Sequence, residues 1–389
     1  MSVNNLSVED CYQLINDLHT QATGVTGVAP TDLSSFISMA NLTLAAGTDT
    51  VYGALMQMVG RTIFSVRPYT RRFGGLVQEA ERWGAIKRKI VFADKDIQDA
   101  EAFMHPVDGS TVDPWKINKA DVLEFRYYGS DAWQDSITVF EDQLRIAMQS
   151  PEQLSSFVSS QMTHMSNKWE QYLENFNRMA LCNMIAAKYS QSADIVHLLT
   201  EYNAQTGLSL TSKTVWQPGN MEGFFRWVRA RINTIARRME ERSTLYQMPI
   251  TGHNIVRHTP AEFLKIYLFA DALDQIDTMV NTVTYHDEPL AYADVEGVSY
   301  WQAIDDPDEI QVTPTYIDGD GIVQTATAQT LTDVFGVMFD RDACATNICQ
   351  YDIANSPYNA RGRYFTTWLS ARMQSLCDLS EKVVVLMLD

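Results

Sequence analysis

A long stripe of apolar side chains at helical spacing constrains this chain more than any other feature. Ser150 is a good N-cap, Pro151 suits the first helical position, and Gln153 completes a Ser-x-x-Gln capping box. Apolar residues then recur at steps of three and four for roughly nine turns, ending near Lys188. The side chains that we expect to form its core face are Leu154, Val158, Met162, Met165, Trp169, Leu173 and Phe176.

A helix of this length would be on the order of 50 Å long, far above the usual length of helices in globular proteins. Each large apolar side chain that is fully buried contributes roughly 2 kcal/mol to stability. The stripe must therefore face an extended partner surface, and we expect this helix to be the backbone of the subunit.

Other stretches predict shorter elements. Helices are predicted at residues 8–19 after Ser7, at 50–60 and at 220–242, and a capping box at Thr259-Pro-Ala-Glu262 predicts one more. Strands are predicted at residues 61–66, 85–92 and 122–128, and in the tail at 334–339, 364–369 and 383–388. Asp318-Gly-Asp-Gly321 lies between two β-like triplets and indicates a hairpin. Helices and strands are segregated irregularly, which favours an α+β fold.

Residues 69–148 differ from the rest of the chain. Their short β-like pieces are separated by turn-rich segments, and they carry few long apolar stripes. Such a stretch does not make an independent core, so we expect an excursion that packs on something else.

Charge is distributed very unevenly. The net charge is −18, residues 1–60 contain no Lys or Arg, and residues 266–340 contain fifteen Asp and Glu but no Lys or Arg. Basic residues concentrate at 61–89 and 222–242. The negative net charge disfavours a protein that binds nucleic acid over a broad surface. The patches are either solvated surface or faces that meet between copies of the chain.

No set of side chains supports a catalytic, cofactor or metal site. The chain lacks phosphate-loop, dinucleotide-binding, nucleophile-elbow and zinc-protease motifs. Its five scattered cysteines are expected to be buried free thiols. Asp318-Gly-Asp-Gly321 lacks the remaining ligands of a calcium loop, so a β-turn is the better interpretation. The carboxylates of residues 305–309 fit a solvated loop as well as a weak cation site.

Membrane and export signals are also lacking. The longest apolar run, residues 383–388, is about a third of what a bilayer span needs. The first cation is Arg61, so the start of the chain lacks the charged region of a secretory signal. We therefore expect a protein that matures in a cytoplasm and has no membrane partner.

The order of these elements resembles the capsid fold of tailed bacteriophages, the Johnson or HK-ninety-seven-like fold. Residues 55–73 look like the start of the E-loop in short-tailed (podovirus) phages, and residues 250–264 are similar to a strand and helix of the A domain. Val334-Phe-Gly-Val-Met-Phe-Asp-Arg-Asp-Ala343 looks like a late strand and turn of such subunits, and residues 359–386 are similar to the closing strand pair. The resemblance covers residues 45–389.

The resemblance implies a domain organisation. It assigns residues 1–60 to an N-terminal arm, 61–148 to the E-loop region, 149–204 to the spine helix and P domain, 205–345 to the A domain, and 346–389 to the closing P-domain strands.

The resemblance also implies a function without catalysis. The chain would be a major capsid protein that self-assembles as hexamers and pentamers into an icosahedral or prolate head around double-stranded DNA. Its partners would be itself, a portal, a scaffolding protein and weakly held DNA, in a virion assembled in the host bacterial cytoplasm. The residues expected at contacts between subunits are Arg67, Arg71, Arg72, Arg82, Lys87, Arg88, Lys89, Arg226, Arg229, Arg237 and Arg238.

Two alternatives remain open at this stage. An encapsulin-type nanocompartment would use the same fold to hold protein cargo. A soluble α+β enzyme without a recognisable motif would be a monomer with a ligand pocket.

Overall fold

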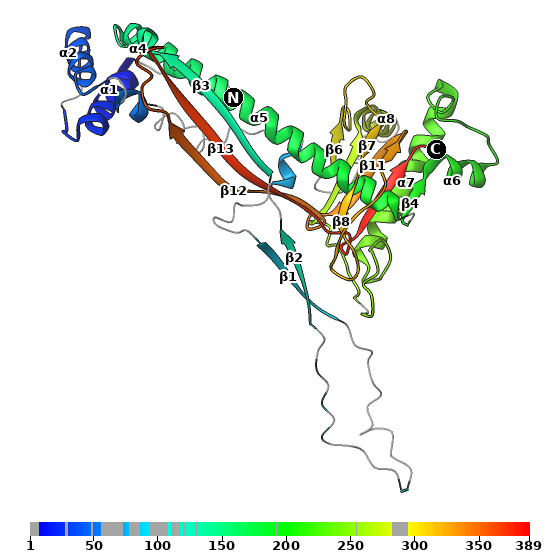
Figure 1. Ribbon diagram of the computed structural model, residues 1–389. Coiled ribbons are helices and arrows are strands. Elements are labelled where there is room, and N and C mark those ends of the chain that lie inside the picture. The colour runs from blue at the N-terminus through cyan, green and yellow to red at the C-terminus, as the bar shows by residue number, and fades with distance from the viewer. Residues whose placement is uncertain are drawn as a thin grey trace.

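A computed structural model gives the architecture of the chain (Figure 1). It describes residues 8–27, 30–47, 50–55, 73–77, 86–93, 108–109, 115, 117, 119, 122–128, 131–191, 193–253, 255–281 and 295–389. The predicted strand at residues 61–66 lies outside these ranges.

One helix crosses the molecule. Helix α5, Pro151–Ser190, runs from the N-terminal helices to a mixed sheet at the other end (Figure 1). Ser150 accepts a hydrogen bond from the backbone N–H of Gln153 at 3.2 Å, so the predicted N-cap is confirmed. At 1.5 Å per residue its 40 residues span about 60 Å. The predicted helix is thus confirmed and extends two residues further.

We expect Ser150→Ala to lower the free energy of unfolding by about 1 kcal/mol, because the Gln153 N–H loses its acceptor. Urea denaturation of the purified chain measures this loss. Ser156→Ala, at an exposed site inside the same helix, is the matched control and should have little effect. Equal losses in both variants would contradict the role of the cap.

The first half of α5 lies in an N-terminal core. Helices α1 (Val8–Thr23), α2 (Leu33–Leu44) and α4 (Glu141–Ala147) and the helical residues 50–55 pack around it. The predicted core residues Leu154, Val158 and Met165 are buried in this cluster. The side chain of Met162 lies outside the described part of the structure.

A long antiparallel sheet follows α5. Its strands are β12 (Cys344–Asn355), β13 (Tyr364–Cys377) and β3 (Asp131–Phe140), in the order β12-β13-β3. The side chains of β13 alternate between buried and exposed, because one face packs on the core. The half-buried Trp169 of α5 contacts Trp133 and Tyr351 of this sheet, with ring centroids 5.3 and 5.6 Å away.

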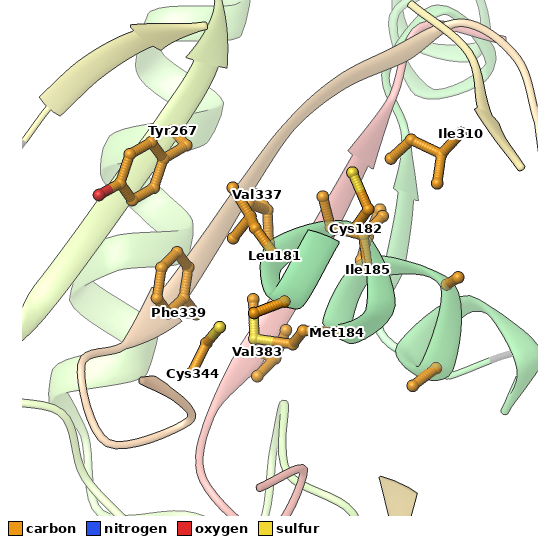
Figure 2. Packing of buried hydrophobic residues seen from close by; sticks show 14 of the residues in the cluster. Leu181, Cys182, Met184, Ile185, Tyr267, Ile310, Val337, Phe339, Cys344 and Val383 are labelled. Atoms are coloured by element: carbon orange, nitrogen blue, oxygen red, sulfur yellow. The ribbon is translucent and has the colours of Figure 1, made fainter. Parts of the chain in front are cut away.

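The second half of α5 covers a five-stranded sheet. Its order is β4 (Ile195–His197), β14 (Val383–Met387), β11 (Val334–Asp340), β5 (Leu264–Phe269) and β6 (Val295–Val298). Figure 2 shows Leu181, Met184 and Ile185 of α5 beside Val337 and Val383 of the sheet. The opposite face is covered by α6 (Leu198–Thr206), α7 (Pro218–Glu240) and α8 (Ala270–Asn281). Strands β11 and β14 are therefore buried on both faces.

One predicted helix is wrong. After a single turn at residues 260–263, the chain enters strand β5 and becomes helical only at Ala270. Strand β5 is Leu-Lys-Ile-Tyr-Leu-Phe and pairs with β11 and β6 inside the sheet. Burial of this apolar segment outweighs the local capping signal at Thr259.

The strand expected near the start of residues 250–264 is also absent among the described residues, which have only an isolated bridge at Arg257. The remaining predicted elements agree with the structure where it describes them. The predicted helices at 8–19 and 220–242 are α1 and α7, and residues 50–55 of the third are helical. The Asp318 turn joins β8 (Thr315–Ile317) to β9 (Val323–Thr325), and β7 (Ile310–Val312) pairs with β10 (Gln329–Leu331). The α+β fold class is confirmed.

Strands β1 (Ile86–Phe92) and β2 (Val122–Tyr128) form an antiparallel pair that extends away from the body (Figure 1). Both strands were predicted from the sequence. Among the described residues, no helix is long and apolar enough to cross a membrane.

Candidate assembly surfaces

An apolar cluster attaches the β1–β2 pair to the body of the subunit. Val91 of β1 and Phe125 of β2 are buried against Ile250 and Ile255 of the loop before β5. Since successive side chains of a strand point to opposite faces, this burial leaves the other face of the pair available for a different contact.

Buried charges lie next to this cluster. The Lys89 ammonium forms ion pairs with the carboxylates of Asp378 and Glu381, which follow β13. Arg257 Nη2 lies 3.5 Å from Glu381 Oε1. Burial alone would lower the pKa of Lys89 and raise that of Asp378, but the ion pairs outweigh burial. The pKa of Lys89 is therefore raised, and that of Asp378 is lowered.

The other face of the β1–β2 pair carries exposed apolar side chains beside the ion pair of Arg126 and Glu124. Ile90, Phe92 and Val122 lie on it, and Trp115 and Ile117, which come between β1 and β2 in the sequence, are 85% and 81% exposed. Soluble monomers rarely expose so many large apolar side chains together. This hairpin surface, defined by these five residues, is a candidate contact with another protein chain.

Helix α7 carries a basic surface. Arg231 pairs with Glu201 at 2.7 Å and Arg226 with Glu222 at 2.8 Å, whereas Arg237 and Arg238 point outward from the last turn. The buried Lys382 ammonium donates to the carbonyls of Arg238 and Glu241 and holds this end of the helix. Burial lowers the pKa of Lys382 to about 8.

An acidic loop lies on the α5 side of the five-stranded sheet. Residues 302–309 join Trp301 to Ile310, and both of these side chains are buried in the cluster that contains the end of α5. The loop presents Ile304, which is 75% exposed, and the exposed carboxylates of Asp305 and Asp306. It is therefore a second candidate contact with opposite charge to α7.

The predicted contact residues do not all fall on one surface. Arg67, Arg71, Arg72 and Arg82 and the side chains of Lys87 and Arg88 lie outside the described part of the chain. The carboxylates that Lys89 meets belong to its own subunit, so its charge is already used there. Arg226, Arg237 and Arg238 are exposed on α7, and Arg229 is half-buried there.

The described residues contain no group of His, Cys, Asp and Glu side chains that could hold a metal ion. Asp318 instead organises its turn by accepting hydrogen bonds from the N–H groups of Asp320 and Ile322. All five cysteines are free thiols, and four are buried. Burial raises the pKa of Cys182 and Cys344 to about 12, so neither is a ready nucleophile.

Solved structures share this architecture. The chain is similar to a chain in the capsid structure of Staphylococcus phage Andhra, with a TM-score of 0.50 and 11% identity over 81% of this chain and 84% of that one. It is also similar to a chain in a solved structure of the head fibre and inner core protein gp22 of native bacteriophage P68. The TM-score there is 0.50, with 10% identity over 82% of this chain and 85% of that one. No curated protein sequence matches significantly.

The spine helix, the long sheet beside it and the projecting strand pair thus define a tailed-phage capsid fold. A model of the Phi29-like phage major capsid protein family matches residues 15–387. The chain belongs to this family. It is a structural protein of the virion that assembles with copies of itself into the head shell, and it is not an enzyme. Neither a nanocompartment shell nor a soluble enzyme is favoured.

Proposed function

We propose that the subunits form hexamers and pentamers that close an icosahedral or prolate head around double-stranded DNA. The observation that carries this proposal is the hairpin surface, whose root is fixed while Trp115 and Ile117 are exposed. In a shell, a neighbouring subunit covers these side chains. Burying them contributes roughly 2 kcal/mol for each large side chain, which exceeds what exposed ion pairs supply.

The domain organisation inferred from the sequence remains part of this proposal. The arm is residues 1–60, the spine and P domain 149–204, the A domain 205–345 and the closing strands 346–389. Within residues 61–148, β3 pairs with β13 and α4 packs on α5, which favours ending the projecting E-loop before Asp131. The strand pair β1–β2 is then the base of the E-loop.

The remaining partners are proposed on general grounds. A closed head needs a portal for DNA entry, and a scaffolding protein would guide assembly in the bacterial cytoplasm. The chain carries a net charge of −18, so packaged DNA would be held only weakly and without sequence preference. An inner wall that proved strongly basic would contradict this last point.

Expression in bacteria, alone and together with the other head proteins of a phage of this family, tests the proposal. Sedimentation and negative-stain microscopy should show rings of five and six subunits or closed shells. A chain that stays monomeric under both conditions would refute it. Purified assemblies should also fail to shift a double-stranded DNA fragment at physiological salt.

A further inference from the structure

The five-stranded sheet separates two surfaces of opposite charge. Alternating side chains of β5 and β14 send Ile266 and Val384 toward α7 and send Tyr267 and Val385 toward the end of α5. The basic surface lies on the first side, and the acidic loop of residues 302–309 lies on the second. Because the sheet stands between them, the two surfaces are not placed to meet within one subunit.

The acidic loop is held in place rather than loosely attached. The backbone N–H of Trp301 donates to the carbonyl of Pro307 at 2.8 Å, and its indole N–H donates to the carbonyl of Val334 at 2.8 Å. Val334 in turn donates its N–H to the carbonyl of Asp308. These bonds fix the loop before any partner arrives, which lowers the entropy cost of a contact.

The side chains of the loop are typical of a protein–protein contact, and not only of a solvated surface. Exposed Ile304 offers apolar area, and the adjacent Asp305 and Asp306 offer charge around it. An apolar centre with a polar rim is the usual anatomy of a protein interface.

The basic surface is equally fixed. Arg237 and Arg238 are exposed on the last turn of α7, and the buried Lys382 holds the carbonyls of that turn. In the neighbouring helix α8, Asp271 and Asp274 are exposed on the same side of the sheet. Together with the exposed Glu240 and Glu241 at the end of α7 itself, they are acidic groups that could compete for the two arginines within one subunit.

We propose that Arg237 and Arg238 of one subunit contact Ile304, Asp305 and Asp306 of the next subunit in the same ring. This inference rests on the proposed rings and names the surfaces that join their members. A contact of either surface with itself would bring like charges together, which disfavours such a complex strongly. Two different surfaces on opposite faces instead give a head-to-tail contact, which closes into a ring when the rotation between neighbouring subunits closes.

Charge reversal tests the contact. Arg237→Glu with Arg238→Glu should weaken ring formation about 100-fold or more, as measured by sedimentation velocity over a concentration series. Asp305→Lys with Asp306→Lys should do the same. Combining all four substitutions should restore rings, because attraction returns with reversed sign. Wild-type rings should dissociate more readily as salt is raised, whereas rings of an Arg237→Gln, Arg238→Gln variant should respond less.

A charge-matched variant excludes rescue by net charge alone. Arg237→Glu, Arg238→Glu, Asp271→Lys and Asp274→Lys also keeps the net charge at −18, but it reverses α8 in place of the loop. This variant should not form rings, and circular dichroism should show all variants folded.

The outcomes separate this contact from the broader proposal. Rescue by the α8 substitutions and not by the loop substitutions would overturn the assigned pairing. So would normal rings in either of the two-site reversals. A wild-type chain that forms neither rings nor shells, alone and together with the other head proteins, would instead overturn the proposed function.

Discussion

Replacing Lys89 by Met should destabilise the subunit by about 3–5 kcal/mol at pH 7, the usual cost of removing one partner of a buried ion pair. Asp378 is almost fully buried and loses its main cation in this variant, while Glu381 loses one of two. The root of the β1–β2 pair should loosen with it. Urea denaturation of the purified chain, with hydrogen exchange of β1 and β2, measures both effects.

The pH dependence gives this prediction a sharper form. In the wild-type chain the pKa of Asp378 lies below its ordinary value of 3.8, so its ion pair stabilises the fold above that pH. Its contribution is lost as the pH falls through the lowered pKa. Without Lys89, we expect burial to outweigh the remaining hydrogen bonds from Ser380 and Tyr127 and to raise the Asp378 pKa, so that the folded variant loses stability as the pH rises through the raised pKa. The deficit relative to the wild type should therefore be larger at pH 7 than near pH 4.

Two variants control for the loss of a charge. Lys89→Arg keeps the cation and should retain most of the stability. Lys168→Met removes a lysine from an exposed pair with Asp135 and should cost at most about 1 kcal/mol. If the loss of unfolding free energy in Lys89→Met is small or does not depend on pH, the ion pairs of Lys89 do not stabilise the attachment of the β1–β2 pair to the body.

Trp301→Ala should lower the free energy of unfolding by about 3–5 kcal/mol. The indole is fully buried in the cluster that contains the end of α5, and its N–H donates to the carbonyl of Val334. The variant leaves a cavity and removes that bond, and the acidic loop loses its anchor. Thermal unfolding with calorimetry measures the loss, and assembly should fail with it.

Two milder variants separate the contribution of the buried Trp301 side chain to stability from that of the exposed part of the loop. Trp301→Phe keeps much of the volume but loses the hydrogen bond, so its loss should be smaller than that of Trp301→Ala. Ile304→Ala alters an exposed side chain of the same loop and should change stability by no more than about 0.5 kcal/mol. If Trp301→Ala unfolds at the wild-type temperature, the loop does not depend on this anchor.

The elements with strong periodic patterns could be predicted from the sequence, and those with weak patterns could not. Helix α5 combines a clear cap with an apolar stripe, so its start was predicted to the residue. Strand β12 has a register shift between Ile348 and Gln350 that breaks the alternation of its side chains. No prediction from alternation could find it, although it forms one side of the long sheet.

The candidate contact surfaces could be predicted from the sequence only in part. Uneven charge pointed to the arginines of α7, and Arg226, Arg237 and Arg238 are indeed on its outer face. The partner of Lys89 could not be inferred, since Asp378 is 289 positions away and carries no local signal. The buried anchor of the acidic loop, Trp301, likewise depends on contacts that only the folded chain creates.

The single helix α5 has a mechanical consequence. It contributes side chains to both the N-terminal core and the core at the five-stranded sheet, and no glycine or proline interrupts it after Pro151. We therefore expect the helix to transmit a force from one end to the other with only the gentle bending usual in long helices. Adjustment to differing shell curvature is then expected chiefly at the two ends of this helix and in the projecting strands.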